Sequence, residues 1–473
     1  MDVRQIFLIV MFALAIACIL KEPTIRLGKR KLKIDYGTAP FLSVLVLAIF
    51  GYVNGEILLQ SLSGVNGVVP WQVIAIFFAG AYICISIDSS GVLEYTSFRI
   101  IRMSGGDAKK LYFGIVGLTA LLTIFTSNDI VILTMTPIIC YMAKHSKINP
   151  IPYLLAVFFA ANAWSMLFYV GNPPNIIVAQ VFNLGFLEYA KYMLAPTVAA
   201  GVSTTLIVYL IFRKELTGKV SLHSHVKPAD YLRNRWAALI NVLVFAAFFV
   251  MLSTAEYIGI EVWMVVLAFF GIYLLLNIFF SFYYKETHFS SNRYHYEKTM
   301  DSMRARNLGF NITEFRMSFE RVPWKMLPLI ASLFVLIHLF TVYGITDHLA
   351  RFLNNFDSLF SCAIATSFVS AASANVMINQ PTTILFANAF QNPGYLVEGT
   401  AKLTSGLALV VGTNLGGNLT LFGALAGLMW KKILSFHDIE MSYGKFLIQS
   451  LKVTPLVILI AALVLLLQMM FLF

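Results

Sequence analysis

The chain has 473 residues and a net charge of +11; 59% of the residues are hydrophobic and only 12% are charged. This composition, with a mean hydropathy of +0.79, excludes an ordinary soluble domain. Long apolar runs without alternating polarity exclude a transmembrane barrel and predict a polytopic α-helical membrane protein. The basic residues lie in short clusters between apolar runs, which is typical of cytoplasmic loops and argues against nucleic-acid binding.

The residues that carry metal and redox chemistry in proteins are scattered in this chain. Its four cysteines are isolated, and no Cys or His spacing typical of a metal site or a disulfide framework occurs. No nucleotide-binding motif of the G-x-x-x-x-G-K-[ST] kind is present. We therefore expect no cofactor and no enzymatic activity, and any ATPase partner would be a separate soluble chain.

The first apolar run, residues 6–20, is followed by the strongly basic stretch 21–33. No small-residue cleavage site follows the run, so we predict a retained first helix with its N-terminus outside. A second helix over about 40–60 leads outward, and a third over about 72–88 returns to basic residues inside.

A polar break interrupts the next apolar unit, "TIFTSNDIVILTMTP", at 126–129. Basic residues flank the unit on both sides, at Lys109 and Lys110 before it and at Lys144 after it. Two full spans need about 40 apolar residues, more than the interval 111–143 offers. We predict a re-entrant hairpin of two half-length arms. Irregular backbone at this depth must be buried or line a cavity, so the tip should face a site.

The following helix is interrupted by "GNPPN" at 171–175. Helix 190–212 comes next, and helices around 236–254 and 262–282 lead out and back. The hydrophilic stretch 285–325 is rich in Lys and Arg, so we predict that it is cytoplasmic and divides the chain into two halves.

The second half repeats the pattern of the first. Helix 326–343 leads outward, and a second apolar–polar–apolar unit follows it. Helix 400–430 is broken at "GTNLGGNLTLFG", and helix 446–472 ends outside. Two halves of opposite orientation, each with a hairpin and a broken helix, form an inverted repeat of the kind found in transporters.

The predicted fold is an all-α polytopic membrane protein with an inverted repeat, two re-entrant hairpins, two broken helices and about 10 full spans. We divide it into a first helix with a basic cytoplasmic loop (1–39), a first repeat (40–235), linking helices with a cytoplasmic loop (236–325) and the core of a second repeat (326–473). It should lie in the cell membrane with both termini outside.

Substrate and ion sites in inverted repeats lie near the midplane, where hairpin tips and broken helices meet. We predict that the hydroxyl, amide and carboxylate side chains of these four segments bind a substrate or ion. The candidates are Thr126, Ser127, Asn128, Asp129, Asn172, Asn175, Ser373, Asn375, Asn379, Thr413, Asn414 and Asn418.

Asp129 has two interpretations. A carboxylate at bilayer depth costs about 2.5–3.5 kcal/mol on insertion scales. It could cap a half-helix N-terminus, or it could bind a proton or another coupling ion. Some of the asparagines could likewise serve only the local turns, and Asn162 is expected to form an interhelical hydrogen bond. Since no Lys or Arg is predicted near the tips, a neutral or singly charged substrate is favoured.

Several stretches, in order along nearly the whole chain, resemble the arsenite permease family of the ion transporter superfamily. They are "SIDSSGVLEY", "IFTSNDIVILTMTPII", "GNPPNIIVAQVFNLGFLEYAKYM", "NVMINQPTTIL" and "GTNLGGNLTLFGALAGLMW". Asn128 and Asp129 match the family's Asn-Asp pair, and Asn379 and Pro381 match its second-hairpin motif. At positions 421 and 424, where the family has Pro and Ser, this chain has Leu and Ala.

The resemblance implies a scaffold and a mobile transport bundle that work by elevator-type alternating access. It also implies export of arsenite or antimonite driven by proton entry. The alternatives within the superfamily are a sodium- or proton-coupled carrier of a small, dicarboxylate-like anion and a sodium/proton antiporter. A passive channel, a homodimer and a membrane subunit for a soluble ATPase are also compatible with the sequence.

Overall fold

The computed structural model describes residues 2–27, 30–64, 69–146, 148–218, 229, 232, 235–283 and 314–472. In these residues the chain is helical except for one antiparallel pair of short strands, β1 (Thr24–Leu27) and β2 (Arg30–Lys33). The sequence predicted only a basic loop there. The predicted helical membrane class is confirmed, and most of the stretch 285–325 lies outside the described residues.

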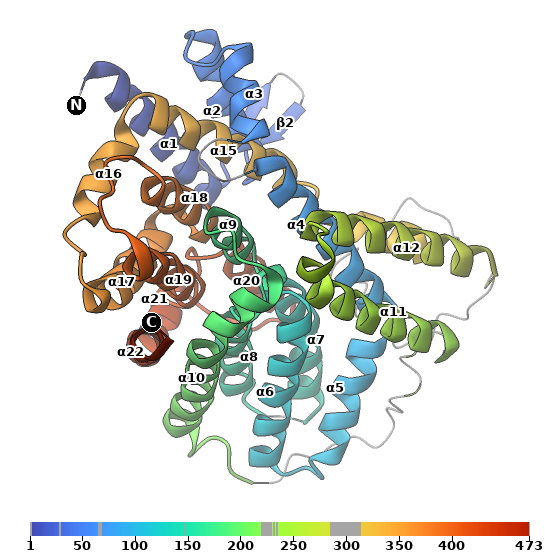
Figure 1. Ribbon diagram of the computed structural model, residues 1–473. Coiled ribbons are helices and arrows are strands. Elements are labelled where there is room, and N and C mark those ends of the chain that lie inside the picture. The colour runs from blue at the N-terminus through green and yellow to red at the C-terminus, as the bar shows by residue number, and fades with distance from the viewer. Residues whose placement is uncertain are drawn as a thin grey trace.

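The first group of helices lies near the N-terminus in Figure 1. It consists of α1 (Val3–Lys21), α2 (Thr38–Ile49), α3 (Gly55–Ser63) and the later α15 (Met326–Val342). α15 packs against α1, α2 and α3. The predicted continuous helix over 40–60 is wrong, because Gly51 takes a φ of +77° and Asn54 caps a new helix by accepting from the Ile57 N–H at 2.8 Å.

The first repeat then runs through a hairpin and a broken helix. Its elements are α4 (Pro70–Ser89), α5 (Val92–Met103), α6 (Ala108–Phe125), α7 (Asn128–Ser146), α8 (Ile151–Trp164), η1 (Tyr169–Gly171), α9 (Pro173–Val181) and α10 (Phe186–Phe212). The linking elements are α11 (Arg235–Thr254), η3 (Glu256–Ile258), α12 (Val262–Tyr283) and α14 (Glu314–Arg321).

The second half shows the same order of a helix, a short helix, a hairpin, a broken helix and a closing helix. After α15 come α16 (Ile345–Leu353), α17 (Leu359–Met377), α18 (Asn379–Phe390), α19 (Gly399–Gly416), α20 (Leu425–Phe436), α21 (Tyr443–Leu451) and α22 (Thr454–Leu472). The closing helices α10 and α22 pack side by side, which joins the two halves. The boundaries between the four predicted domains stay a prediction.

The arms of the first hairpin are longer than predicted. α6 has 18 residues and α7 has 19, so each is about 27–29 Å long at 1.5 Å per residue. The prediction of half-length arms is wrong because the helices continue through the basic residues Lys109, Lys110 and Lys144, which were taken as the ends of the arms. The turn at the polar break is where it was expected.

The tip of the second hairpin is strained. α17 and α18 are separated by one residue, Ile378, whose φ is +72°. A β-branched residue is unfavourable in this region because its side chain crowds the backbone. The short connection places Asn379 at the start of α18, next to the end of α17.

The two helix breaks also lie where the sequence predicted them. Pro173 and Pro174 occupy the first turn of α9, where their missing N–H groups are not needed. Gly171 has no room for a side chain, since a Cβ would overlap the Ser165 carbonyl oxygen. In the second half α19 ends at Gly416 and α20 begins at Leu425, and the segment 417–424 between them is called here the second break.

The helices α17 and α19 approach closely because small residues face each other. Gly412 and Gly416, four residues apart on α19, lie against Ser367, Ser370 and Ala371 of α17. A Cβ on Gly412 would overlap the Ser370 hydroxyl and the Ser367 carbonyl oxygen. Small-residue contacts of this kind let membrane helices gain van der Waals contact without a hydrophobic driving force.

Gly412→Ala is expected to destabilise the folded protein by about 1–3 kcal/mol, because overpacking must move α17 away from α19. The measurement is the thermal unfolding midpoint of the purified protein in detergent. Gly117→Ala on the exposed face of α6 is the control, since a Cβ there meets nothing within 4 Å. Equal midpoints for the two variants would contradict the close packing.

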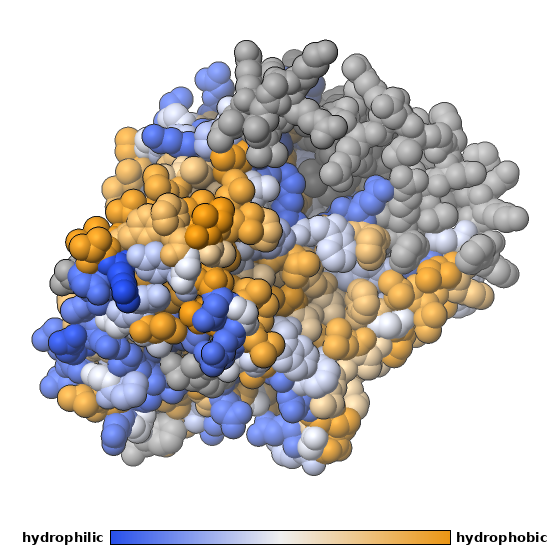
Figure 2. Space-filling view, turned by 90° about the horizontal axis from the view of Figure 1, so that it is seen from above, coloured by the Kyte–Doolittle hydropathy of each residue, from blue (hydrophilic) through white to orange (hydrophobic). Residues whose placement is uncertain are grey.

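In the described residues, nine helices are long and apolar enough to cross a membrane. Their exposed faces are apolar, as expected for surfaces in contact with lipid. Figure 2 shows hydrophobic side chains over much of the visible surface between hydrophilic patches. A stripe of exposed apolar side chains at helical spacing runs along α10, formed by Leu187, Leu194, Val198, Val202, Leu206 and Leu210.

A buried ion pair lies at the end of α4. The side chain of Asp88 is fully buried and pairs with Arg321 of α14. The same carboxylate accepts a hydrogen bond from the Thr134 hydroxyl of α7 at 3.1 Å. The Asp88 carboxylate therefore connects α14 with an arm of the first hairpin.

Candidate functional site

The tip of the first hairpin is joined to the second break by a relay of buried amides. Asn128 donates from Nδ2 to Asn162 Oδ1 at 2.8 Å, and Asn162 donates from Nδ2 to Asn418 Oδ1 at 2.8 Å. All three side chains are at most 2% exposed. The predicted interhelical role of Asn162 is confirmed, and this residue of α8 links the two halves of the chain.

The tip of the second hairpin is held by the same break. The Asn379 backbone N–H donates to the Gly423 carbonyl at 3.0 Å. The Thr420 hydroxyl donates to Asn375 Oδ1 at 2.6 Å, and Asn375 Nδ2 donates to the Gly416 carbonyl at 2.9 Å. Segment 417–424 therefore contacts the second hairpin tip directly and is joined to the first through Asn162.

Asn414 of α19 joins the two broken helices. Its Oδ1 accepts from Asn172 at 2.7 Å and from the Ser165 hydroxyl at 3.2 Å. Its Nδ2 donates to Asn175 Oδ1 at 2.9 Å. Buried amides need hydrogen-bond partners, and these contacts fix the first break against the second half. Asn172, Asn175 and Asn414 therefore have structural partners whether or not they also contact a substrate.

The carboxylate of Asp129 differs from these amides because it forms no hydrogen bond or ion pair with any described residue. It lies in the first turn of α7, where the helix dipole favours a negative charge. Its side chain is only partly buried. The backbone cap at this turn belongs to Ser127, whose Oγ accepts from the Ile130 N–H at 3.4 Å. The geometry therefore leaves the Asp129 carboxylate available to a ligand.

One residue of the N-terminal group lies close enough to Asp129 to sense its charge. Tyr36 is in the loop between β2 and α2. Burial raises its pKa to about 12, and the charges of Asp35 and Asp129 add to that rise. The first hairpin tip thus lies near the loop between β2 and α2.

Two buried amide oxygens at the hairpin tips lack a hydrogen-bond donor among the described residues. They are Asn128 Oδ1 at the start of α7 and Gln380 Oε1 at the start of α18. A buried acceptor without a donor costs about 1–3 kcal/mol, so such groups call for an explanation. Both are suited to accept a hydrogen bond from a hydroxyl-bearing ligand or to coordinate a cation.

Four helices begin at the tips and breaks. They are α7, α9, α18 and α20. A helix N-terminus carries a partial positive charge and free N–H groups, which favour anionic or electron-rich groups. The segments around the breaks thus offer neutral acceptors and donors, one carboxylate and helix ends.

Besides Ser127 and Asp129, three of the predicted residues lie outside the hydrogen-bond network. Thr126 and Thr413 donate their hydroxyls to carbonyls of their own helices, Leu122 and Leu409. Ser373 is partly buried in α17 and forms no side-chain hydrogen bond with the described residues. Whether any of the twelve predicted residues binds a substrate stays a prediction.

Sequence reasoning missed three members of the site. Ser165 follows α8 and supports Asn414, Thr420 supports Asn375, and Gln380 adds an acceptor at the second tip. Thr420 and Gln380 lie within the polar segments of the second half, and their location there is the sequence feature that could have identified them. In the described residues no group of three or more His, Cys, Asp or Glu side chains could hold a metal ion.

Comparisons with known proteins agree with this architecture. Residues 33–399 match the family model described as Citrate transporter. The chain is 27% identical over 410 residues to an arsenical pump membrane protein of Escherichia coli, covering 84% of this chain and 86% of that protein. It is 28% identical over 415 residues to the arsenical pump membrane protein of Yersinia enterocolitica, covering 85% and 88%. The resemblance predicted from the motifs is confirmed.

A solved structure supports the fold. The crystal structure of the YdaH transporter of Alcanivorax borkumensis, described as having an unusual topology, has a TM-score of 0.55 at 14% identity. The match covers 98% of this chain and 97% of that one. Together with the apolar helices, hairpins and breaks, the family match identifies the chain as a multi-pass membrane transporter that belongs to the citrate transporter family.

Proposed function

We propose that the protein is a secondary active transporter of the cell membrane that exports arsenite or antimonite and is driven by proton entry. The observation that carries this proposal is the pair of buried amide oxygens without donors, Asn128 Oδ1 and Gln380 Oε1, at the two hairpin tips. The names of the relatives point to the same class of cargo.

Arsenous acid is uncharged at neutral pH and bears hydroxyl groups. Such a solute needs acceptors for its O–H groups and donors for its oxygens, and a ring of amides supplies both. None of the hydrogen bonds of the network involves a Lys or Arg side chain. This supports a neutral cargo, which needs no positive side chain for recognition.

Asp129 is the proposed proton carrier. A carboxylate inside the membrane is expensive unless it serves a purpose, and this one has no partner among the described residues. Protonation would remove its charge while the hairpin passes the lipid. The proton taken up from outside would then be released inside, which completes one cycle of proton entry.

The proposed movement is of the elevator type. The relay Asn128–Asn162–Asn418 and the contacts of Asn414 connect both hairpins and both broken helices through hydrogen bonds. These elements can move as one body against α1, α2, α3 and α15. We place both chain termini outside the cell, following the distribution of basic residues.

Transport in vesicles tests the cargo and the coupling ion. Purified protein is reconstituted into proteoliposomes, and movement of arsenite and antimonite is measured with an imposed pH gradient, with a sodium gradient and with neither. The expected result is movement driven by the pH gradient alone. Strict dependence on sodium, or equal movement without any gradient, would contradict proton-driven export; the second result would indicate a channel.

A second candidate is a sodium- or proton-coupled carrier of a small, dicarboxylate-like anion, or a sodium/proton antiporter of the same superfamily. The description of the matching family model and the four helix N-termini at the tips and breaks favour an anion. Uptake of labelled citrate and succinate in the same vesicles distinguishes this candidate from the first. Uptake of these acids, and inhibition of arsenite movement by them, would support an anion carrier.

The relatives are named arsenical pump membrane proteins, which is compatible with a soluble ATPase partner and with a homodimer. Export from vesicles that contain no ATP, at a full rate under a pH gradient, is expected of the protein acting alone. A strict need for added ATP and a second protein would overturn that expectation.

A further inference from the structure

An open groove with two arginines lies on α5, away from the amide network. Four side chains of α5 line it, Tyr95, Arg99, Arg102 and Met103, together with Ala229, and its volume is about 400 Å³. Positions 95, 99, 102 and 103 fall on one helical face. The opposite face of α5 is buried, at Leu93, Ser97 and Ile101.

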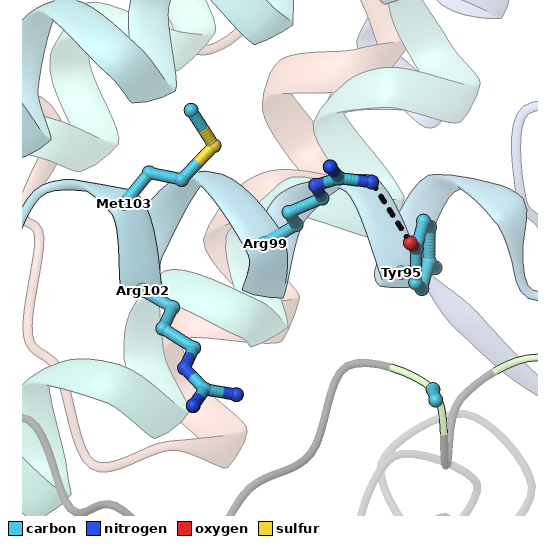
Figure 3. Close-up of a pocket in the computed structure, with 5 residues that line it drawn as sticks. Tyr95, Arg99, Arg102 and Met103 are labelled. Carbon is cyan, nitrogen blue, oxygen red and sulfur yellow. Dashed lines mark hydrogen bonds between the residues drawn. The ribbon is translucent and has the colours of Figure 1, made fainter.

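The two arginines have no acidic partner among the described residues. Arg99 donates to the Tyr95 hydroxyl at 3.0 Å, as Figure 3 shows, and its guanidinium lies 6.0 Å from the centre of that ring. Arg102 extends from the helix and forms no hydrogen bond or ion pair with the described residues (Figure 3). Guanidinium groups favour phosphate, which they can bind through two parallel hydrogen bonds.

An apolar stripe lies on the next helix, α6, beside the helix that lines the groove. α6 packs against α5, where Gly114 lies so close to Ile100 that a Cβ would come within 2.7 Å of its side chain. Phe113, Leu121 and Phe125 are 37%, 56% and 38% exposed and are spaced by multiples of four residues, so they line one face of α6. Met103, 74% exposed, lies at the basic end.

A molecule with an anionic head and long apolar chains matches both parts. The basic cluster is on the predicted cytoplasmic side, where the leaflet carries anionic lipids that attract basic segments. A free phosphate would use the arginines but would leave the stripe on α6 without a role. We propose that the α5 groove binds the phosphodiester headgroup of an anionic membrane lipid, whose acyl chains lie along the exposed face of α6.

Native mass spectrometry of the purified full-length protein tests the proposal. The probes are dioleoylphosphatidylglycerol, the zwitterionic dioleoylphosphatidylcholine and glycerol phosphate, which has the head without the chains. We expect phosphatidylglycerol to bind in preference to both. The double variant Arg99→Gln/Arg102→Gln should weaken this binding by about 30-fold, given the contribution of each basic residue to attraction by an anionic lipid.

The matched control is Arg213→Gln/Lys214→Gln, which removes the same charge from two exposed residues after α10. It should keep the binding of phosphatidylglycerol within about twofold. Equal losses in the two double variants would overturn the proposal in favour of general surface charge. Binding of glycerol phosphate as tight as that of the lipid would overturn it in favour of a free-anion site. Unchanged binding in the first variant would overturn it outright.

Discussion

Asp129→Asn is expected to reduce proton-driven transport to the level of protein-free vesicles while the protein stays folded. Asparagine keeps the shape of the side chain but cannot take up a proton near neutral pH. Because the carboxylate has no hydrogen bond or ion pair with the described residues, its replacement removes no native contact, and the unfolding midpoint should shift by less than about 3 °C. The measurements are arsenite movement under a pH gradient and thermal unfolding in detergent.

Asp357→Asn is the matched control for this variant. Asp357 is exposed and lies outside the hairpin tips, just before α17, so transport should continue at the wild-type rate. If Asp129→Asn exports arsenite at a full rate against a gradient, Asp129 is not the proton carrier. Transport lost together with the folded state would instead give Asp129 a structural role.

Arg321→Gln is expected to destabilise the protein by about 3 kcal/mol. Asp88 is fully buried, and removal of its ion-pair partner leaves an uncompensated charge, which typically costs about 3–5 kcal/mol. The lower end applies because the Arg321 side chain is 33% exposed. Unfolding by heat or denaturant in detergent measures the loss.

A double-mutant cycle separates the pair from other effects of the substitution. Asp88→Asn/Arg321→Gln removes both charges, so it should recover part of the stability lost in Arg321→Gln. Asp88→Asn keeps an acceptor for the Thr134 hydroxyl. If the double variant loses more free energy of unfolding than Asp88→Asn and Arg321→Gln lose together, the buried charge is not the source of the loss.

The polar interruptions were sufficient to predict the hairpins and the breaks. Asn128 and Asn379 start new helices where apolar runs are cut by amides and hydroxyls, and Pro173 marks the first break. Lipid explains this success, because backbone polar groups there must be satisfied within the protein. An interruption at bilayer depth therefore has few structural solutions.

The features that sequence reasoning missed depend on tertiary contacts, which the pattern of residues along the chain does not reveal. The contact of Thr420 with Asn375 and that of Asp88 with Arg321 join residues far apart in the chain. The length of α6 was underestimated because Lys109 was read as a boundary, whereas a lysine can continue a helix and extend its charge to the interface. The strand pair near the N-terminus was missed although Ile25 and Leu27, and Leu32 and Ile34, alternate with basic residues, because the charges alone indicated a loop.

The left-handed backbone of Ile378 bears on how the second hairpin could open. A non-glycine residue in this region holds about 1–3 kcal/mol of conformational energy. In the present arrangement that energy is balanced by the hydrogen bond of Asn379 to Gly423 and by the near-complete burial of the Ile378 side chain. Rotation of a single peptide unit would release this conformational energy. Less free energy is therefore needed to rearrange the second hairpin tip than to rearrange an unstrained turn.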